Sequence, residues 1–148
     1  MKKLNIALAI LLGLSAFSAQ ASVANAEKLA SIYTTVAKGT NPDFVPSAED
    51  GKTFFNQKVK AANGKETACA SCHTANPADS GKHIVTGKSI RPLSPVVNNK
   101  RFSDYDKVET QFTKHCNDIL GADCKTTDKA NYITYLLTEK TPTPKTKK

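Results

Sequence analysis

Methionine and arginine are scarce in this chain of 148 residues, and no apolar stretch is long. Met1 is the only methionine, so no methionine remains to bind a metal once the N-terminal residue has been removed. Arg91 and Arg101 are the only arginines among 21 basic residues. The longest apolar run, Ile6–Phe17, has about 12 residues, whereas a helix that crosses a membrane needs roughly 20. We therefore expect no stable membrane insertion.

The start of the chain has the three parts of an export signal. Lys2-Lys3 is basic, Ile6–Phe17 is a short apolar stretch, and Ala19-Gln20-Ala21 is a small-x-small cleavage site. A retained membrane anchor is the alternative, and the shortness of the apolar run argues against it. We therefore predict that residues 1–21 are a cleaved signal peptide, that the mature chain begins at Ser22, and that the protein is periplasmic.

The chemistry of the chain is centred on Cys69-Ala70-Ser71-Cys72-His73. Two cysteines separated by two residues and followed at once by histidine form the attachment signature of c-type haem. Each thiol adds to one vinyl group of the porphyrin, and the adjacent imidazole becomes the proximal iron ligand. Half a zinc site or a thioredoxin-like redox pair also contains Cys-x-x-Cys, but neither requires the histidine. The motif predicts one covalently bound haem c, with Cys69 and Cys72 as attachment points and His73 on the iron.

Size and charge fit one small exported domain. Removal of 21 residues leaves 127, which is enough for a single domain with one core, and we place that domain at residues 22–140. Without Lys2 and Lys3, 19 basic residues stand against 13 acidic ones, a net charge of +6. Export excludes nucleic acid as a partner. The basic surface therefore indicates either steering toward an acidic redox protein or ordinary solubility, and we expect a monomer.

Hydrophobic spacing and capping residues predict a helical domain. We expect helices over residues 25–38, 47–59, 103–120 and 127–139, the first three capped by Asn25, Ser47 and Ser103. The segment 76–99 is rich in Pro, Gly, Ser and Asn, and we expect this long loop to cover the proximal side of the haem. The tail, residues 141–148, contains three lysines and is predicted to be disordered.

The lack of methionine leaves the second axial position of the iron to other groups. The remaining candidates are His83, His115, lysines, Asn98 and Asn99, or no ligand at all. His83 lies ten residues past His73, in the segment that should cover the proximal side. We therefore expect His83 to be an exposed loop histidine.

His115 falls in an apolar stripe of the predicted helix over 103–120, together with Val108, Phe112 and Ile119. A histidine on an apolar face must find a partner or bear a desolvation cost. A satisfied core histidine is the ordinary interpretation, but a haem that needs a distal ligand favours iron coordination. Catalysis would need a polar acid–base pair above the iron, so we expect electron transfer and no enzyme activity.

Cys116 and Cys124 are left after haem attachment, an even pair in an oxidising compartment. We predict that they form a disulfide, with free thiols as the alternative. Gly121 lies between them and lets the chain turn back. A ring of this size contributes about 2.5 kcal/mol in the chain-entropy model. Its position matters more, because it restricts how His115 approaches or leaves the iron.

Two further contacts with the haem site are predicted. Arginine binds carboxylates in a bidentate way better than lysine, so we expect Arg91 or Arg101 to contact a haem propionate, with plain surface charge as the alternative. Pro92 or Pro95 offers a carbonyl that can accept a hydrogen bond from the free N–H of His73 and fix its ring orientation. The sequence does not choose between these two prolines.

Two blocks of the sequence resemble one family. Cys-Ala-Ser-Cys-His-Thr at 69–74, with Thr-Lys-His-Cys-Asn-Asp-Ile-Leu-Gly-Ala-Asp-Cys at 113–124, is similar to the cytochrome c″ family of methylotrophic bacteria. The similarity extends through Lys-Arg-Phe at 100–102 and Tyr-Leu-Leu-Thr-Glu at 135–139, so it covers nearly the whole mature chain. The histidine and cysteine block at 113–124 is far more specific than the haem motif alone.

The resemblance implies a fold and a function. It implies an all-α, class I cytochrome c core around one covalent haem, with an additional N-terminal helix and with His73 and His115 as axial ligands. It also implies an electron carrier in which His115 detaches on reduction and couples electron transfer to proton uptake. The related sphaeroides haem protein type has asparagine on the distal side and binds small ligands. Under that variant Asn98 or Asn99 is the candidate, and binding of O₂, NO or CO is the alternative function.

Overall fold

The structure, a computed structural model of the whole chain, describes residues 6–60 and 64–145, with the side chains of its first helix from Gln20 onward. Within these residues the elements are, in chain order, α1 (Ile6–Lys38), α2 (Ala48–Asn56), β1 (Val59–Lys60), β2 (Glu66–Thr67), α3 (Cys69–His73), β3 (Gly81–Lys82), β4 (Ser89–Ile90), α4 (Tyr105–Leu120) and α5 (Thr126–Thr138). β1 pairs with β2 and β3 with β4, both antiparallel. Because each strand has only two residues, the predicted all-α class is confirmed.

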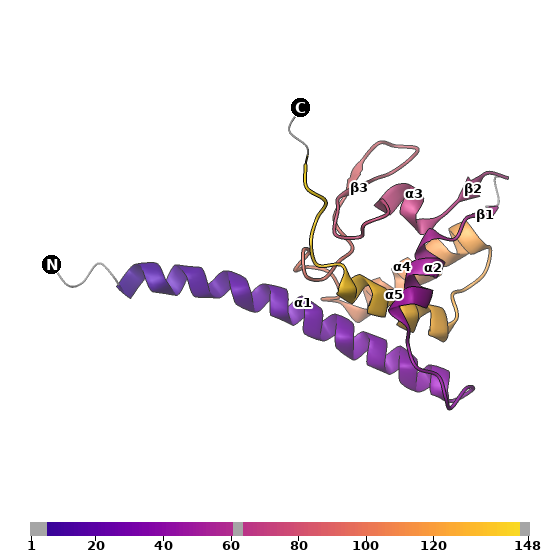
Figure 1. Cartoon of the computed structure of the whole chain (residues 1–148), viewed down its shortest axis with the longest axis horizontal. Helices are drawn as coiled ribbons and strands as arrows, with labels where there is room; N and C mark the ends of the chain where they lie inside the picture. The colour runs from indigo at the N-terminus through magenta and orange to yellow at the C-terminus, as the bar shows by residue number, and fades with distance from the viewer. Residues whose placement is uncertain (1–5, 61–63, 146–148) are drawn as a thin grey trace.

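The first helix is longer than the sequence predicts. It is expected to begin at Asn25, but α1 begins at Ile6 and continues through the predicted cleavage site, and its N-terminal half extends away from the other elements (Figure 1). Asn25 is an exposed residue inside the helix and not its cap. Alanine has the highest helix propensity, and the four alanines between 19 and 26 favour one continuous helix. Cleavage after Ala21 stays a prediction.

No helix in residues 6–60 and 64–145 combines the length and the apolar character that a membrane crossing requires.

The part of α1 that packs begins at Ser22. This side chain is 2% exposed, and its Oγ donates to the main-chain oxygens of Asn98 and Arg101. Gln20 and Ala21, immediately before it, are exposed. The packed part of α1 therefore starts at the residue predicted to begin the mature chain.

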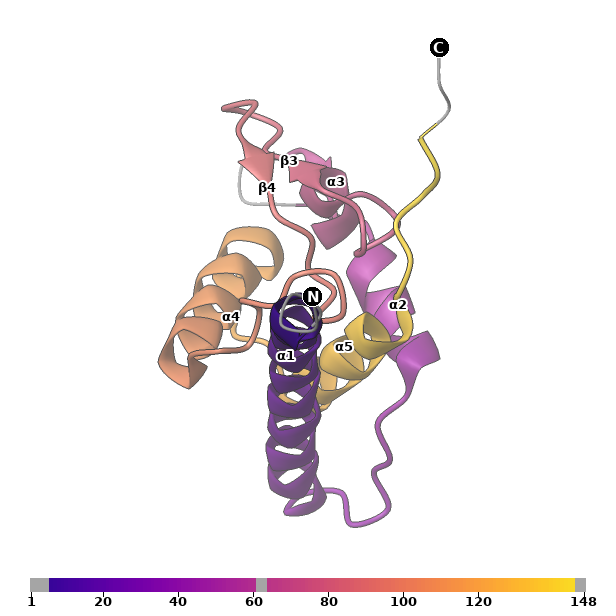
Figure 2. The same cartoon turned by 90° about the vertical axis from the view of Figure 1, so that its left-hand side faces the viewer.

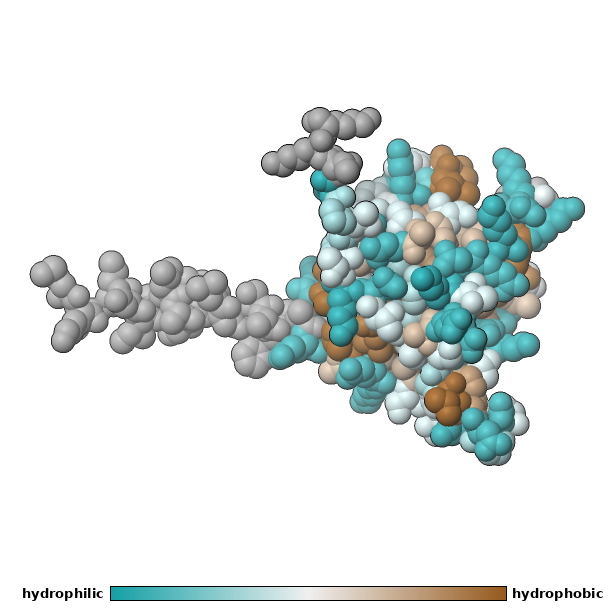
Figure 3. All heavy atoms as spheres, viewed as in Figure 1, coloured by the Kyte–Doolittle hydropathy of each residue, from teal (hydrophilic) through white to brown (hydrophobic). Residues whose placement is uncertain are grey.

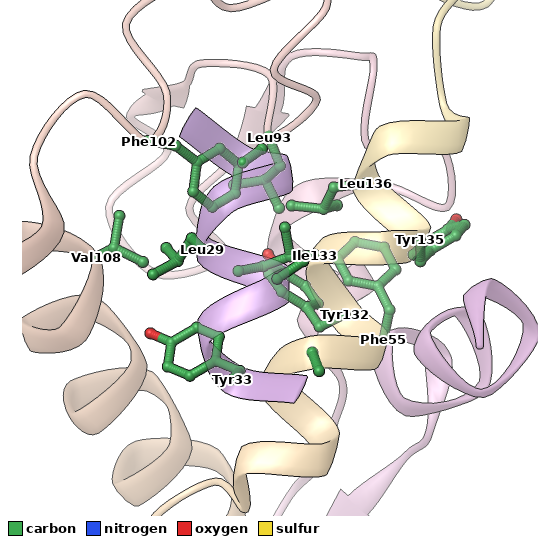
Figure 4. Close-up of a cluster of buried hydrophobic side chains, with 13 residues drawn as sticks. Leu29, Tyr33, Phe55, Leu93, Phe102, Val108, Tyr132, Ile133, Tyr135 and Leu136 are labelled. Carbon is green, nitrogen blue, oxygen red and sulfur yellow. The ribbon is translucent and has the colours of Figure 1, made fainter. Parts of the chain in front are cut away.

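The hydrophobic core lies between α1, α2 and α5 (Figure 4). Its largest fully buried side chains include Phe55 from α2 and Ile133, Tyr135 and Leu136 from α5. α4 lies on the side of α1 away from α2 (Figure 2) and contributes Val108. α1 and α2 therefore both pack on α5, whereas α4, the helix that carries His115, lies at the edge of the core.

α2 and α5 cross with no room for a side chain at Gly51. A Cβ atom there would lie 2.1 Å from the main-chain oxygen of Asn131 and 2.8 Å from Cβ of Tyr135. The same asparagine fixes the start of α2, because its Oδ1 accepts from the backbone N–H of Ser47 at 2.8 Å. Ser47 also accepts from Asp50 N at 3.1 Å, so the predicted cap of this helix is confirmed.

Gly51→Ala should lower the free energy of unfolding by about 2–3 kcal/mol, because the added methyl group must push the two helices apart. Urea unfolding followed by haem absorbance measures the change. Lys52→Ala, at an exposed neighbouring position on the same helix, is the control and should change stability by less than about 0.5 kcal/mol. Equal effects of the two substitutions would contradict the close crossing.

Other helix ends differ from the predictions by one to three residues. α2 ends at Asn56 and not at residue 59, because Val59 pairs with Thr67 in the β1–β2 ladder. The cap of α4 is Asp104, which accepts from Lys107 N at 3.1 Å, and not the predicted Ser103. α4 ends at Leu120 as predicted, with Gly121 in the left-handed conformation at φ 72°.

The predicted loop 76–99 is ordered around buried residues. Pro77, Ser94 and Pro95 are fully buried, and the main-chain oxygen of Pro77 accepts from the N–H groups of Leu93 and Ser94 at 2.8 and 3.0 Å. The β3–β4 hairpin projects from the middle of this loop. Buried proline rings and backbone hydrogen bonds therefore order this loop, although its sequence has no helix-like or strand-like hydrophobic spacing.

The beginning of the tail makes contacts that were not predicted. Thr143 N and Oγ1 donate to the two carboxylate oxygens of Asp79, each at 2.7 Å, and Asn76 Nδ2 donates to the main-chain oxygen of Thr141 at 3.0 Å. Residues 146–148, the end of the predicted basic tail, lie outside the described residues.

Candidate haem-binding site

The Cys-x-x-Cys-His motif forms its own short helix. Ala68 is extended before it, and its N–H donates to Ser71 Oγ at 3.0 Å while its carbonyl accepts from Ser71 N at 3.0 Å. This short helix places Cys69 and Cys72 three residues apart, and both are half-buried free cysteines. His73 ends the helix and is 9% exposed. The two thiols and the imidazole are therefore presented together by local structure.

The chemistry of Cys69 argues against a thioredoxin-like pair. Burial raises the pKa of its thiol to about 11. A redox-active Cys-x-x-Cys needs a thiolate, which requires a lowered pKa. In the described ranges, no group of three or more His, Cys, Asp or Glu side chains suited to a metal ion occurs.

The rings of His73 and His115 lie close together. Their ring centroids are 6.2 Å apart and their planes differ by 28°. A metal–imidazole bond is about 2 Å long, and the bound nitrogen lies about 1 Å from the ring centroid, so two imidazoles on opposite sides of one ion have centroids about 6 Å apart. The spacing of the two rings therefore fits a shared iron, and with the two free thiols it fits a haem.

Both imidazoles are held in the neutral form that binds metals. Burial, the neighbouring His115 and Arg101 lower the pKa of His73 to about 4. Partial burial and then Lys114 lower the pKa of His115 below its ordinary value. A neutral imidazole offers a nitrogen lone pair, which the protonated ring does not.

The environment of His115 differs from the prediction in one respect. Val108 is buried and Phe112 and Ile119 are half-buried, as an apolar stripe requires, but His115 itself is exposed in the protein. Its position at the C-terminal half of α4, beyond the edge of the core, is the reason. The predicted apolar stripe itself is present, the ring of His115 lies close to that of His73, and iron coordination by His115 stays a prediction.

The other candidate ligands make different contacts. His83 is exposed in the β3–β4 turn, as predicted, and its Nδ1 accepts from the N–H groups of Val85 and Thr86 at 3.3 and 3.1 Å. Asn98 has its side-chain amide engaged within the loop, and Asn99 is exposed. Only His115 among the histidines and asparagines considered forms a ring pair with His73 in the described residues.

The predicted proline contact of His73 is absent. The main-chain oxygen of Pro92 accepts from Asn98 Nδ2 at 2.8 Å instead. Nδ1 of His73 is buried, and neither Pro92, Pro95 nor any other described residue accepts its hydrogen bond. The sequence shows which carbonyls are near in the chain but not how the loop orients them.

The two arginines have different surroundings. Arg91 is exposed. Arg101 is half-buried, its Nε is buried without a partner among the described residues, and its Cζ lies 5.1 Å from the centroid of the Phe102 ring. Its charge lowers the pKa of both His73 and His115, so it lies beside the site. The structure therefore favours Arg101 for the propionate contact, which stays a prediction.

Cys116 and Cys124 form a disulfide, with Cα atoms 5.5 Å apart and both residues buried. Within the ring, Asn117 Nδ2 donates to Asp123 Oδ1 at 2.7 Å. The bridge closes the end of α4 one residue after His115. It therefore ties the segment that follows the candidate distal ligand.

Gly81 is a site residue that the sequence reasoning missed. A Cβ atom there would lie 2.2 Å from the main-chain oxygen of Cys72 and 3.0 Å from Cα of His73. β3 therefore packs directly on the backbone of the haem motif. Gly81 is not followed by residues typical of a turn, so nothing in the sequence indicates this close contact.

A second missed feature attaches α4 to the core. Glu109 accepts from Lys129 Nζ of α5 at 2.7 Å and from the hydroxyl of Tyr33 of α1. The same Lys129 Nζ lies 5.3 Å from the ring centroids of Tyr33 and Phe112. We call Tyr33, Glu109 and Lys129 the α4 anchor. It lies less than two helical turns before His115 on the same helix.

The geometry agrees with comparisons to known proteins. Residues 42–136 match a family model described as a domain of unknown function, DUF1924. Cytochrome c″ of Methylophilus methylotrophus is 64% identical over 126 residues, which cover 84% of this chain and 88% of that protein. The chain belongs to the cytochrome c″ family. It is therefore a c-type cytochrome, a haem protein, as the motif at 69–73 predicted.

Solved structures support the same assignment. The crystal structure of oxidised cytochrome c″ from the same organism superposes with a TM-score of 0.78 at 65% identity, over 82% of this chain and 99% of that one. A more distant relative is the cytochrome c-type protein SHP of Cereibacter sphaeroides, 33% identical over 60% of this chain and 68% of that protein. An oxidised SHP structure, of an oxygen-binding cytochrome c, matches with a TM-score of 0.67 at 28% identity. The predicted cytochrome fold with an N-terminal helix is confirmed.

Proposed function

We propose that this cytochrome is an exported electron carrier with one covalent haem c, whose axial ligands are His73 and His115. The observation that carries the proposal is the pair of neutral imidazoles with centroids 6.2 Å apart. Cys69 and Cys72 would hold the haem through thioether bonds, and Arg101 would bind a propionate. The bound haem supplies an iron that accepts and returns one electron. We place the mature protein in the periplasm, as a monomer.

His115 is proposed to leave the iron on reduction and to bind a proton. Two neutral imidazoles favour ferric iron, which carries the extra positive charge, and this preference weakens on reduction. The freed ring nitrogen then becomes available to take a proton, because its lone pair no longer binds a metal. A solution structure of the Methylophilus relative, 64% identical, concerns the structural basis of haem-ligand detachment.

A second candidate function is the binding of O₂, NO or CO as the physiological task. The oxygen-binding SHP relative favours it. Departure of an exposed His115 would leave the iron open on that side. Reversible oxygen binding by the reduced protein, with slow oxidation, would support this candidate over electron transfer.

The haem should be covalent. Mass spectrometry of the exported protein should show the polypeptide from Ser22 plus one haem, which acidified organic solvent does not extract. Cys69→Ala with Cys72→Ala should release the haem into that solvent, because both predicted thioether bonds are lost. Extraction from the unaltered protein would refute the attachment.

The reduction potential should depend on pH with a defined sign. The proton is bound only by the reduced form, so low pH favours reduction and the potential falls as pH rises, by about 59 mV per unit. The slope should end above the pKa of the freed His115, which partial burial and Lys114 hold below its ordinary value. Spectroelectrochemical titration between about pH 5 and 9 measures it. If the potential does not change with pH and the reduced protein is low-spin, the protein is an electron carrier that does not release His115.

A further inference from the structure

The tip of the β3–β4 hairpin displays the most exposed apolar side chains near the haem motif. Ile84 is 64% and Val85 83% exposed. On the face shown in Figure 3, hydrophobic atoms gather in small separate patches bordered by hydrophilic ones. Two adjacent branched apolar side chains in water are unfavourable unless another surface covers them.

The turn that carries this pair is fixed by hydrogen bonds. His83 N donates to the Lys88 carbonyl at 2.9 Å, and Gly87 N donates to the His83 carbonyl at 2.8 Å. The imidazole Nδ1 of His83 accepts from the N–H groups of Val85 and Thr86 at 3.3 and 3.1 Å. The apolar pair is therefore held in one conformation, which reduces the entropy lost when a partner binds.

The hairpin is rooted on the haem attachment segment. Gly81, its first strand residue, packs against the Cys72 carbonyl so closely that a Cβ atom would be 2.2 Å away. Gly81 pairs with Ile90 and Lys82 with Ser89 across the ladder. A protein seated on the tip would therefore be close to the segment that holds the haem.

The loop that carries the tip has charged side chains of one sign only. From residue 80 to residue 103 the chain has five basic residues and no acidic one. Three exposed basic residues lie here: Lys82 in β3, Lys88 directly before β4 and Arg91 directly after it. An apolar centre bordered by cations is the arrangement that receives a negatively charged protein surface with an apolar middle. A second copy of this chain would meet the same positive charges and be repelled.

We propose that Lys82, Ile84, Val85 and Lys88, which we call the hairpin surface, are the docking site for an acidic electron-transfer protein. The proposal rests on the proposed electron-carrier function. The lysines steer the partner and raise its association rate, and the apolar pair holds it once seated. Flavodoxin, an acidic electron-transfer protein, is the probe, and stopped-flow absorbance measures electron transfer from its reduced form to the ferric holoprotein.

The charge test compares two double variants with the same net charge. Lys82→Glu with Lys88→Glu should slow the second-order rate at low salt by about tenfold or more, with a weaker salt dependence. Lys28→Glu with Lys38→Glu, at exposed positions on α1, whose C-terminal end lies away from the hairpin (Figure 2), should slow it less than about threefold. Equal slowing by both pairs would show that only net charge matters and would overturn the docking site.

The apolar test uses binding as a second readout. Ile84→Ser with Val85→Ser should weaken flavodoxin binding about tenfold while the salt dependence stays that of the unaltered protein. In NMR titrations of the unaltered protein, the methyl signals of Ile84 and Val85 should shift. Unshifted signals, or binding of the hairpin lysines to phosphatidylserine vesicles and not to flavodoxin, would overturn the proposal. Failure of the unaltered protein to accept electrons at all would instead refute the electron-carrier function.

Discussion

His115→Ala should convert the ferric protein from a low-spin to a high-spin form that binds external ligands such as imidazole or cyanide. The reason is geometric, because His115 is the side chain whose ring faces His73 at 6.2 Å, and alanine leaves no nitrogen there. The sequence offers no methionine after Met1 to replace it. Absorption and electron paramagnetic resonance spectra of the ferric protein measure the conversion, which should be nearly complete at neutral pH.

The same substitution should remove most of the pH dependence of the potential near neutrality. The proton that accompanies reduction is proposed to bind the freed His115, so its loss should flatten the slope of about 59 mV per pH unit. Free imidazole added to the variant should restore the low-spin spectrum. Restoration would show that the site lacks a ligand and is not misfolded.

His83→Ala is the matched control. His83 is the other histidine outside the haem motif, it is exposed, and its ring nitrogen accepts from the turn of the β3–β4 hairpin. Its replacement should leave the low-spin spectrum and the pH slope unchanged. If the His83 variant loses the low-spin spectrum while the His115 variant retains it, the distal ligand is His83, and the proposed release of His115 is wrong.

Sequence reasoning succeeds where chemistry or structure is local. The motif at 69–73 folds into one turn that presents Cys69, Cys72 and His73 together. Ser47 caps α2 because its hydroxyl reaches the N–H of Asp50 three residues on, a contact that sequence spacing encodes. Gly121 ends α4 because only a residue without Cβ adopts its left-handed conformation readily. These features depend on neighbours within one helical turn.

It fails where distant segments meet. The space at Gly51 and at Gly81 is set by backbone from α5 and from the haem motif, and a glycine in a sequence does not show what approaches it. The exposure of His115 depends on where α4 lies relative to the core, although its apolar stripe was identified correctly. The two arginines are indistinguishable in sequence, whereas the structure buries Arg101 beside both histidines and leaves Arg91 in water.

The α4 anchor gives the second large expected effect. Glu109 and Lys129 are mostly shielded, with side-chain exposures of 29% and 13%, and the hydroxyl of Tyr33 also donates to Glu109. Burial alone raises the pKa of Glu109, but hydrogen bonds from Lys129 and Tyr33 outweigh it and lower the pKa below its ordinary value. The carboxylate is therefore charged at neutral pH and holds α4 against both α1 and α5.

Glu109→Gln should lower the free energy of unfolding by about 2 kcal/mol, because it leaves the shielded ammonium of Lys129 without a charged partner. It should also let α4 move more freely, so His115 leaves the iron at lower temperature. Urea unfolding measures the first effect, and the temperature at which the ferric low-spin spectrum is half lost measures the second. Asp106→Asn, at an exposed position in the first turn of α4, is the control and should change both by little.

The pH dependence of stability distinguishes loss of the charged α4 anchor from a nonspecific destabilisation of α4. A carboxylate with a lowered pKa stabilises the folded state above its ordinary pKa of about 4.3, and this contribution is lost as pH falls through the lower, folded pKa. The unaltered protein should therefore lose stability below about pH 4.3 more steeply than Glu109→Gln, and the two should converge in acid. Tyr33→Phe should show a smaller loss at neutral pH and should be non-additive with Glu109→Gln. Additive losses with parallel acid profiles would mean that Glu109 acts alone and that the anchor does not position His115.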